Sequence, residues 1–418
     1  MKHAIIILIL SALTVTASAC SAFLEAERES MTPNIPSPYI PVESPPEERI
    51  ELEDYSELNI EILNLILAHE GTGLFVIYEP ETEDMVVAVE LLADEIETNH
   101  PIGAFATSDI SATIRTATAY TEIDIIIEYK RTQEQVDSII NVATMRYLRT
   151  ELLGIMREHR DEAAFRTSLN ITEEAIRDYM KDIYYSNPRS IIMLPVVALE
   201  AFPAEGEDRI YELRFGHIEP SSILQQYAVS LATNVRYNAG LAIGGNDGEI
   251  LLTLARNLIA STSFDEPAAR AISEHGPQNF AATAFGALVR QSAVGEGFAM
   301  AFKALSDELG FDCRIVLGYR DGMVHAWNIV SLFGEYYHID VAMGALDGLE
   351  TAFLKTDDDF MALQYVWDFE NTVKCNGKLT YEDFVYREDD IEYNDDDEND
   401  TDDSENGDDN FEDDIEEG

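Results

Sequence analysis

Apolar and polar positions follow two different periods across residues 50–220, and each change of period predicts an element. Helical spacing gives way to strand-like alternation twice in this region. The predicted elements, in chain order, are a helix at 86–97, two strands of which the second is 122–129, a helix at 173–185, and paired strands at 190–202 and 209–215. A helix–strand–strand unit is therefore either duplicated here, or two amphipathic stretches resemble each other by chance.

The segment between these two stretches, residues 133–160, predicts one long helix or a pair of helices. Beyond the second stretch, helices are expected at 222–237 and 249–261, separated by a glycine-rich turn at 240–245. No metal-ligand or nucleophile spacing occurs within 50–220. This region is therefore expected to be a packing or ligand-presenting domain.

A third pattern, from residue 295 onward, combines one helix with an antiparallel hairpin. The helix has a single apolar stripe and ends at Gly310; its stripe residues are Phe298, Phe302, Leu305 and Leu309. A strand at 313–319 follows, and 325–332 and 335–342 predict a hairpin that turns at Phe333 and Gly334. A two-residue turn places His325 opposite Ala342, with Asp340 as its diagonal neighbour on the same face. The predicted fold class is α/β (α+β), with this helix packed on an antiparallel sheet and an α/β region before it.

The two ends of the chain have compositions of their own. Lys2 and the apolar run 4–13 are typical of an export signal, and small residues then precede Cys20. This arrangement resembles a bacterial lipoprotein box. It predicts a signal peptide at 1–19 and lipidation of Cys20, or plain secretion if Cys20 is not lipidated. Residues 20–49 hold six prolines between Pro33 and Pro46 and predict an extended linker.

Acidic residues dominate the charge, with 80 Asp and Glu against 27 Lys and Arg and a net charge of −53. Residues 388–418 contain nineteen acidic and no basic residues, which predicts a disordered acidic tail that collects cations loosely. Such a field repels nucleic acid, so no nucleic-acid partner is expected. The expected location is the extracytoplasmic face of a cell membrane, with membrane lipid as the partner of the Cys20 anchor. The remaining region, 221–387, is expected to form one domain.

Three segments carry the candidate chemistry. They are AVGEGFAMAF at 293–302, HAWNIV at 325–330 and YYHIDV at 336–341. Together they resemble the Cys–His–Asp core of the bacterial transglutaminase-like superfamily, which is related to papain-type thiol enzymes. Segments 283–289, 353–357 and 367–368 extend the resemblance over about 280–370. The family has a cysteine where this chain has Gly295.

The resemblance implies a papain-like core that transfers acyl groups from glutamine or peptide amides through a thioester. His325 and Asp340 occupy the retained triad positions. Gly295 has no side chain to attack a carbonyl, and loss of such a nucleophile typically costs on the order of a million-fold in turnover. We therefore expect a pseudoenzyme that binds a peptide, polyamine or cell-wall ligand, with Glu296 and Trp327 as ligand contacts. No cofactor and no metal site are expected.

Other residues are poor replacements for the missing nucleophile. Cys313 falls within a predicted strand and is expected to be a buried thiol. Cys375 falls in a polar segment beyond the predicted core, and a hydroxyl at Ser292 would miss the end of the helix. An acyl-transfer enzyme that uses His325 and Asp340 with an unidentified nucleophile remains the alternative, and a purely structural stalk protein is a third class.

Two further patterns imitate ligand sites. Gly295 and Gly297 before a helix resemble a dinucleotide fingerprint, but Met300 occupies the third glycine position, where close packing needs a small residue. Residues 402–413 match a calcium loop in part. In so acidic a segment, such a match is expected by chance.

Overall fold

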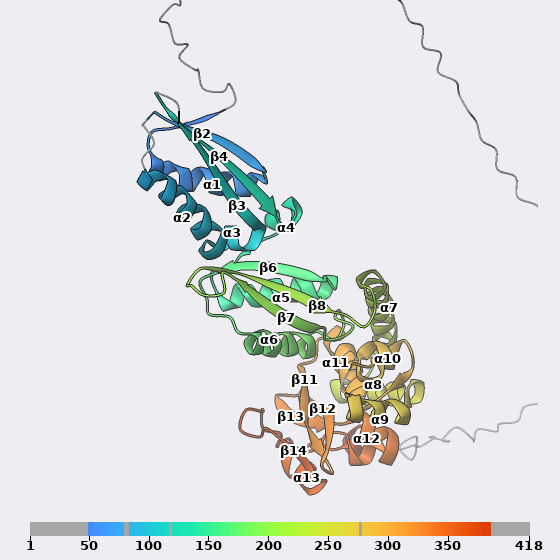
Figure 1. Ribbon diagram of the computed structural model, residues 1–418. Coiled ribbons are helices and arrows are strands. Elements are labelled where there is room, and N and C mark those ends of the chain that lie inside the picture. The colour runs from blue at the N-terminus through green and yellow to red at the C-terminus, as the bar shows by residue number, and fades with distance from the viewer. Residues whose placement is uncertain (1–48, 79–82, 117–118, 276–277, 386–418) are drawn as a thin grey trace, which may run out of the picture. The chain divides into compact units, whose positions relative to one another are not determined.

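The computed structural model describes residues 49–78, 83–116, 119–275 and 278–385, and it mixes helices with β-sheets throughout (Figure 1). The α/β class expected from the sequence is therefore confirmed. The predicted signal peptide, Cys20, the proline-rich linker up to residue 48 and the acidic tail lie outside the described residues. Within the described ranges, none of the helices combines the length and the apolar character that crossing a bilayer requires.

Two successive α/β units share one topology. The first consists of β1 (Ile50–Leu52), α1 (Leu58–Ala68), β2 (Thr72–Ile77), α2 (Glu83–Asn99), α3 (Pro101–Ala106), β3 (Thr107–Thr116) and β4 (Thr121–Tyr129). The second consists of β5 (Ile140–Asn141), α5 (Met145–Glu158), β6 (Glu162–Thr167), α6 (Glu173–Ser186), β7 (Val196–Phe202) and β8 (Arg209–Gly216). Their strand orders are β1-β2-β4-β3 and β5-β6-β8-β7. In each sheet the first pair is parallel and the other pairs are antiparallel.

The helix–strand–strand order expected twice from the sequence is present in both units, preceded each time by a parallel strand–helix–strand segment. Residues 133–160 form a pair of helices, one of the two arrangements predicted: the short α4 (Gln133–Asp137) and α5, separated by β5, because Thr132 and Thr144 each cap a helix start. One boundary differs from the prediction, because the strand expected from Ser190 begins only at Val196. It follows Pro195, which has no N–H for a strand ladder.

The second unit and the C-terminal region share one hydrophobic core. A single cluster of buried residues includes Phe165, Tyr211, Leu231, Phe302 and Phe353. The helices that contribute to it or surround it are α7 (Ser221–Gly240), α8 (Asp247–Ser261), α9 (Glu266–His275), α10 (Ala284–Leu288) and α11 (Gly295–Glu308). A second cluster centres on the first unit, around residues such as Phe75 and Ile125, and Ala164 and Ile210 of the second unit complete it.

Helix α11 packs on a four-stranded antiparallel sheet of order β13-β12-β11-β14. The elements here are β11 (Cys313–Arg320), β12 (Met323–Leu332), β13 (Glu335–Ile339), α12 (Val341–Asp347), α13 (Asp357–Ala362) and β14 (Tyr365–Trp367). The register expected for the hairpin is confirmed, because Leu332 pairs with Glu335 and Asn328 with Ile339. The turn residues Phe333 and Gly334 have φ of 51° and 87°, as a two-residue hairpin turn requires.

The expected pairing of His325 with Ala342 is wrong. Strand β13 ends at Ile339, and α12 begins at Val341 with Asp340 as its N-cap. His325 pairs instead with Gly318 on the opposite neighbour, β11.

Gly297 sets how closely α11 approaches the segment before it. A Cβ atom at this position would lie 2.1 Å from the carbonyl oxygen of Ala281, which is backbone and cannot rotate away. We expect Gly297→Ala to lower the free energy of unfolding by about 1–3 kcal/mol. The matched control is Gly154→Ala in α5, where a Cβ meets nothing within 4 Å and where alanine should add up to about 1 kcal/mol. Urea unfolding of both variants measures the difference, and equal effects would contradict the proposed close approach.

Candidate functional site

The site is built around the first residue of α11. Val294, in extended conformation, caps the helix, and its N–H donates to the Ala281 carbonyl at 2.9 Å. Gly295 follows and is buried. A Cβ atom at Gly295 would lie 2.8 Å from both Nδ1 and Cε1 of His325. The imidazole therefore lies directly against the position from which a side chain at 295 would project.

A buried carboxylate orients this imidazole. His325 Nε2 and Asp340 Oδ2 are 2.5 Å apart, and Asp340 is only 1% exposed. Tyr365 donates its hydroxyl to the same oxygen at 2.7 Å, and the Met343 N–H donates to Oδ1 at 2.9 Å. Burial alone raises the pKa of Asp340, but the charge of His325 and these hydrogen bonds outweigh burial and lower the pKa overall. Asp340 is therefore an ionised carboxylate, and Nδ1 is the ring nitrogen that faces Gly295.

The structure thus brings together the three residues expected to form the degenerate triad: Gly295, His325 and Asp340. It also adds Tyr365, a second partner of the carboxylate that the sequence did not single out. Tyr365 lies on β14, twenty-five positions after Asp340, and no short-range pattern links the two. Its hydroxyl is held in a protein interior, and burial raises its pKa, so it acts as a donor.

Trp327 is not a ligand contact, and the prediction that it would be one is wrong. Its indole is 0% exposed and donates from Nε1 to His338 Nδ1 at 2.9 Å. It stacks behind His325 at a ring-centroid distance of 6.2 Å. Trp327 therefore supports the imidazole from the protein interior: residues two apart in β12 share one face of the sheet, and Trp327 packs there in a buried cluster with Val316 and Phe360.

His338, Asp357 and Cys375 form a buried cluster behind Trp327. One donor atom from each residue lies within 4.8 Å of the others. Because the Trp327 N–H donates to Nδ1, the neutral His338 ring carries its proton on Nε2, which lies 2.9 Å from Asp357 Oδ1. A metal at Nε2 would need the proton on Nδ1, where it would meet the indole N–H. The cluster is thus satisfied as a hydrogen-bonded support and does not fit a metal.

Neither described thiol can serve the imidazole. Both Cys313 and Cys375 are free and buried. Burial raises the pKa of Cys313 to about 12, and Cys313 lies beside Ser306, far along α11 from Gly295. The expectation that Cys375 lies beyond the core is wrong, because Cys375 is 0% exposed and its N–H donates to Asp357. Burial and Asp357 raise its pKa as well. The Ser292 hydroxyl is also engaged, since it donates to Asp265 at 2.8 Å.

Glu296, the second residue of α11, connects the site to the second α/β unit. Its Oε1 accepts a hydrogen bond of 2.8 Å from the Tyr185 hydroxyl at the end of α6. Burial raises the pKa of Glu296 to about 7, although the Tyr185 hydrogen bond opposes this rise. Its side chain retains some exposure, and its predicted role as a ligand contact stays a prediction.

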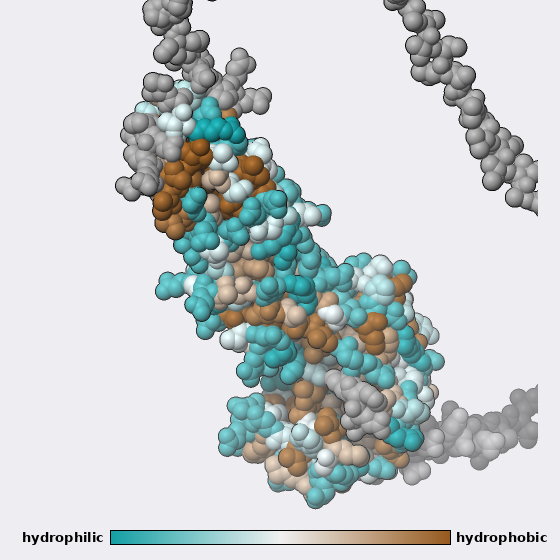
Figure 2. Space-filling model, in the orientation of Figure 1, coloured by the Kyte–Doolittle hydropathy of each residue, from teal (hydrophilic) through white to brown (hydrophobic). Residues whose placement is uncertain are grey.

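Exposed apolar side chains lie on the strands next to the site. Tyr319 on β11 pairs with Val324 on β12 and with Val366 on β14. The three are 50%, 83% and 62% exposed. Hydrophilic residues cover most of the face seen in Figure 2, and hydrophobic residues form separate patches within it. These three paired residues therefore share one face of the sheet and form an exposed apolar surface there, whereas His325, the neighbour of Val324 in β12, belongs to the other face.

The raised pKa of Glu296 predicts a specific pH dependence of stability. Between the ordinary value of 4.5 and about 7, the folded protein keeps a proton that the unfolded chain has lost. Stability therefore falls as the pH rises through this window, by up to about 3 kcal/mol from this group. Glu296→Gln should remove this decline, while Glu174→Gln on the exposed start of α6 should keep it. Urea unfolding at pH 5, 6, 7 and 8 tests this, and parallel curves for wild type and Glu296→Gln would contradict it.

Comparisons with known proteins give fold-level likeness only. No family model matches the chain, and no curated protein matches it. Among solved structures, a TGase shares 14% identity and a TM-score of 0.26, covering 58% of this chain and 65% of its own. A candidate cysteine protease from Cytophaga hutchinsonii shares 12% identity and a TM-score of 0.23, covering 41% of this chain and 66% of its own. A candidate protease from Parabacteroides distasonis shares 8% identity and a TM-score of 0.18, covering 65% and 43%. In each case less than two thirds of the solved chain is matched.

Proposed function

We propose that this protein is an extracytoplasmic lipoprotein whose transglutaminase-like domain binds a ligand without turning it over. One observation carries the proposal. The His325–Asp340 pair is assembled and aimed at the start of α11, and the residue it faces is Gly295. An oriented imidazole beside a helix N-terminus is the frame of a thiol active site. Here the frame lacks the nucleophile.

The space for a sulfur atom is also reduced. A Cβ at 295 would approach His325 Nδ1 to 2.8 Å, closer than normal non-bonded contact. The imidazole therefore lies nearer to the helix than it could beside a cysteine. The position of the imidazole therefore supports our proposal that the site has adjusted to a residue without a side chain at 295. It does not favour a site that uses a substitute nucleophile there.

The surroundings favour a bound ligand over an empty remnant. Tyr319, Val324 and Val366 provide exposed apolar contacts on the same strands as His325 but on the opposite face of the sheet. The imidazole is 17% exposed and can meet a ligand. A peptide or cell-wall peptide is long enough to pass around the end of β12 and contact both the apolar surface and the imidazole. The net charge of −53 also favours cationic groups on the ligand, as in a polyamine.

Attachment through a lipidated Cys20 would hold this domain at the extracytoplasmic face of a cell membrane, at the end of the proline-rich linker. The acidic tail would collect loosely bound cations, and nucleic acid remains excluded by charge. The alternative, an acyl-transfer enzyme with another nucleophile, needs a reactive group beside Nδ1. Among the described residues the two thiols are buried elsewhere, so this alternative has no observed support.

Restoring the nucleophile tests the degenerate-site proposal. We expect Gly295→Cys to gain amine incorporation or peptide hydrolysis, because the oriented imidazole can then activate a thiol. Gly295→Ala is the steric control, since it adds the same Cβ without a sulfur. Wild type and Gly295→Ala should both be inactive. Turnover by the wild-type protein that is lost in His325→Ala would overturn the proposal and support the enzyme alternative.

Charge placed on the apolar strand surface tests the binding role. Val324→Asp should weaken binding of short peptides bearing apolar side chains at least about tenfold, since it puts a carboxylate against an apolar group. Val229→Asp on α7 changes the net charge equally at a side chain that is 69% exposed. Calorimetric titration of both variants measures the effect. Equal affinities in the two variants would place the ligand elsewhere.

A further inference from the structure

A cavity lies at the opposite end of α11 from Gly295. It has a volume of about 710 Å³ and is formed where α5, α6, α7 and α11 come together. This volume is within the range of small-molecule sites. Because α11 has fourteen residues, its two ends are about 20 Å apart. The cavity is therefore distinct from the site at His325.

Three arginines line this cavity. They come from three different elements: Arg157 from the last turn of α5, Arg189 from the segment after α6, and Arg236 from α7. The whole chain has only 27 basic residues against 80 acidic ones. Three guanidinium groups around one cavity are therefore a marked local reversal of the charge of the molecule.

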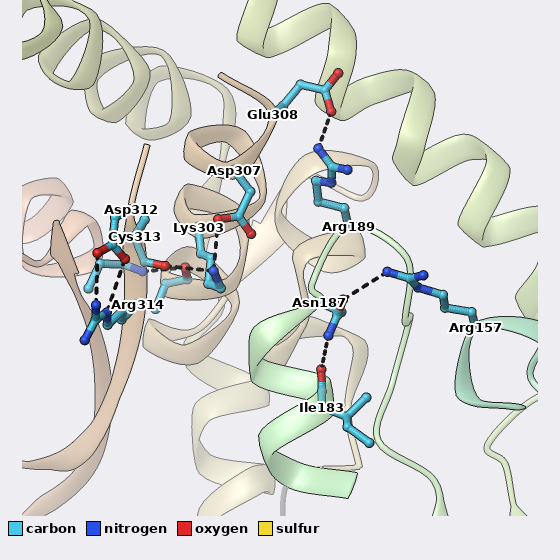
Figure 3. A network of polar contacts seen from close by, with 12 residues as sticks. Arg157, Ile183, Asn187, Arg189, Lys303, Asp307, Glu308, Asp312, Cys313 and Arg314 are labelled. Atoms are coloured by element: carbon cyan, nitrogen blue, oxygen red, sulfur yellow. Dashed lines mark hydrogen bonds and ion pairs between the residues drawn. The ribbon is translucent and has the colours of Figure 1, made fainter. Parts of the chain in front are cut away.

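Hydrogen bonds within the protein use only part of the donor capacity of Arg157 and Arg189. Arg157 donates to two neutral groups, Ser190 Oγ at 3.2 Å and Asn187 Oδ1 at 3.1 Å. Arg189 donates through Nη1 to Glu308 at 2.7 Å. Figure 3 shows these two arginines approaching from different elements, one directed at Asn187 and the other at Glu308. Arg236 is exposed and has no hydrogen-bond or ion-pair partner among the residues that the structure describes.

The acidic residues in the cavity are already paired. Glu308 is held by Arg189, and Asp307 accepts a hydrogen bond of 2.9 Å from Lys303. Among the residues that the structure describes, Arg157 and Arg236 are thus left without a carboxylate partner.

The arginines are also not needed as helix caps. At α5 and α11 the Arg160 and Phe311 N–H groups donate to the terminal carbonyls of Ile155 and Ser306.

We infer that this cavity binds a small oxyanion, a phosphate or carboxylate group held between Arg157, Arg189 and Arg236. Guanidinium groups match the planar, two-oxygen face of both anions. Ser186 adds a hydroxyl donor, and Val235 and Phe311 give an apolar wall for the rest of the ligand. At physiological salt the repulsion from distant carboxylates is screened within about 8 Å, so the local arginines decide binding.

Titration calorimetry of the full chain with inorganic pyrophosphate, and separately with citrate, in 150 mM sodium chloride tests this inference. Binding of pyrophosphate alone supports a phosphate ligand, and binding of citrate alone supports a carboxylate ligand. Arg236→Gln should weaken binding at least about tenfold without changing the thermal midpoint of the free protein, because the side chain has no internal partner. Arg146→Gln, an exposed arginine of α5 without a partner among the described residues, removes the same charge and should bind as wild type does. Absence of binding by both probes, or equal losses in the two variants, would overturn the inference.

Discussion

The hydrogen bond between His325 and Asp340 fixes the geometry of the C-terminal region. Asp340 follows directly after β13, caps α12 through Met343, and holds both His325 of β12 and Tyr365 of β14. A single buried carboxylate thus joins three strands and a helix. Because each donor compensates part of the cost of burying the charge, removing one of them leaves the others around an under-satisfied anion. The fold itself uses this carboxylate, so the geometry of His325 and Asp340 has a structural role of its own.

This dependence separates the structural and chemical roles of the triad. A substitution at residue 295 leaves the carboxylate of Asp340 undisturbed, since its hydrogen bonds go to His325, Met343 and Tyr365. His325 is held by Asp340 on one side and by Trp327 on the other, and its Nδ1 faces the start of α11. Selection for stability alone would therefore keep the imidazole and the carboxylate in place. Their presence is not evidence of turnover.

The sequence was informative where the signal is local. Hairpin register followed from the two-residue turn at Phe333 and Gly334, and the apolar stripe placed α11. The pairing of His325 with Ala342 failed because a carboxylate that caps a helix also ends a strand, and alternation alone does not show which role Asp340 takes. The prediction for Cys375 failed for another reason. Its segment is polar in sequence, yet Cys375 is buried, with its N–H donating to Asp357 and its thiol close to His338. Tyr365 and the three arginines were missed because only tertiary packing brings them to their sites.

One short segment of the second α/β unit reaches both ends of the site helix. Tyr185 contacts Glu296 in the first turn of α11, and Arg189 contacts Glu308 at its last residue. Two residues that are only four positions apart in this segment therefore contact two residues that are twelve positions, or about 18 Å, apart on α11. Two contacts so far apart restrain the tilt of the helix as well as its position, whereas either contact alone would allow it to pivot. The second unit thus acts as a brace for α11, and its main hydrophobic core is continuous with that of the C-terminal region.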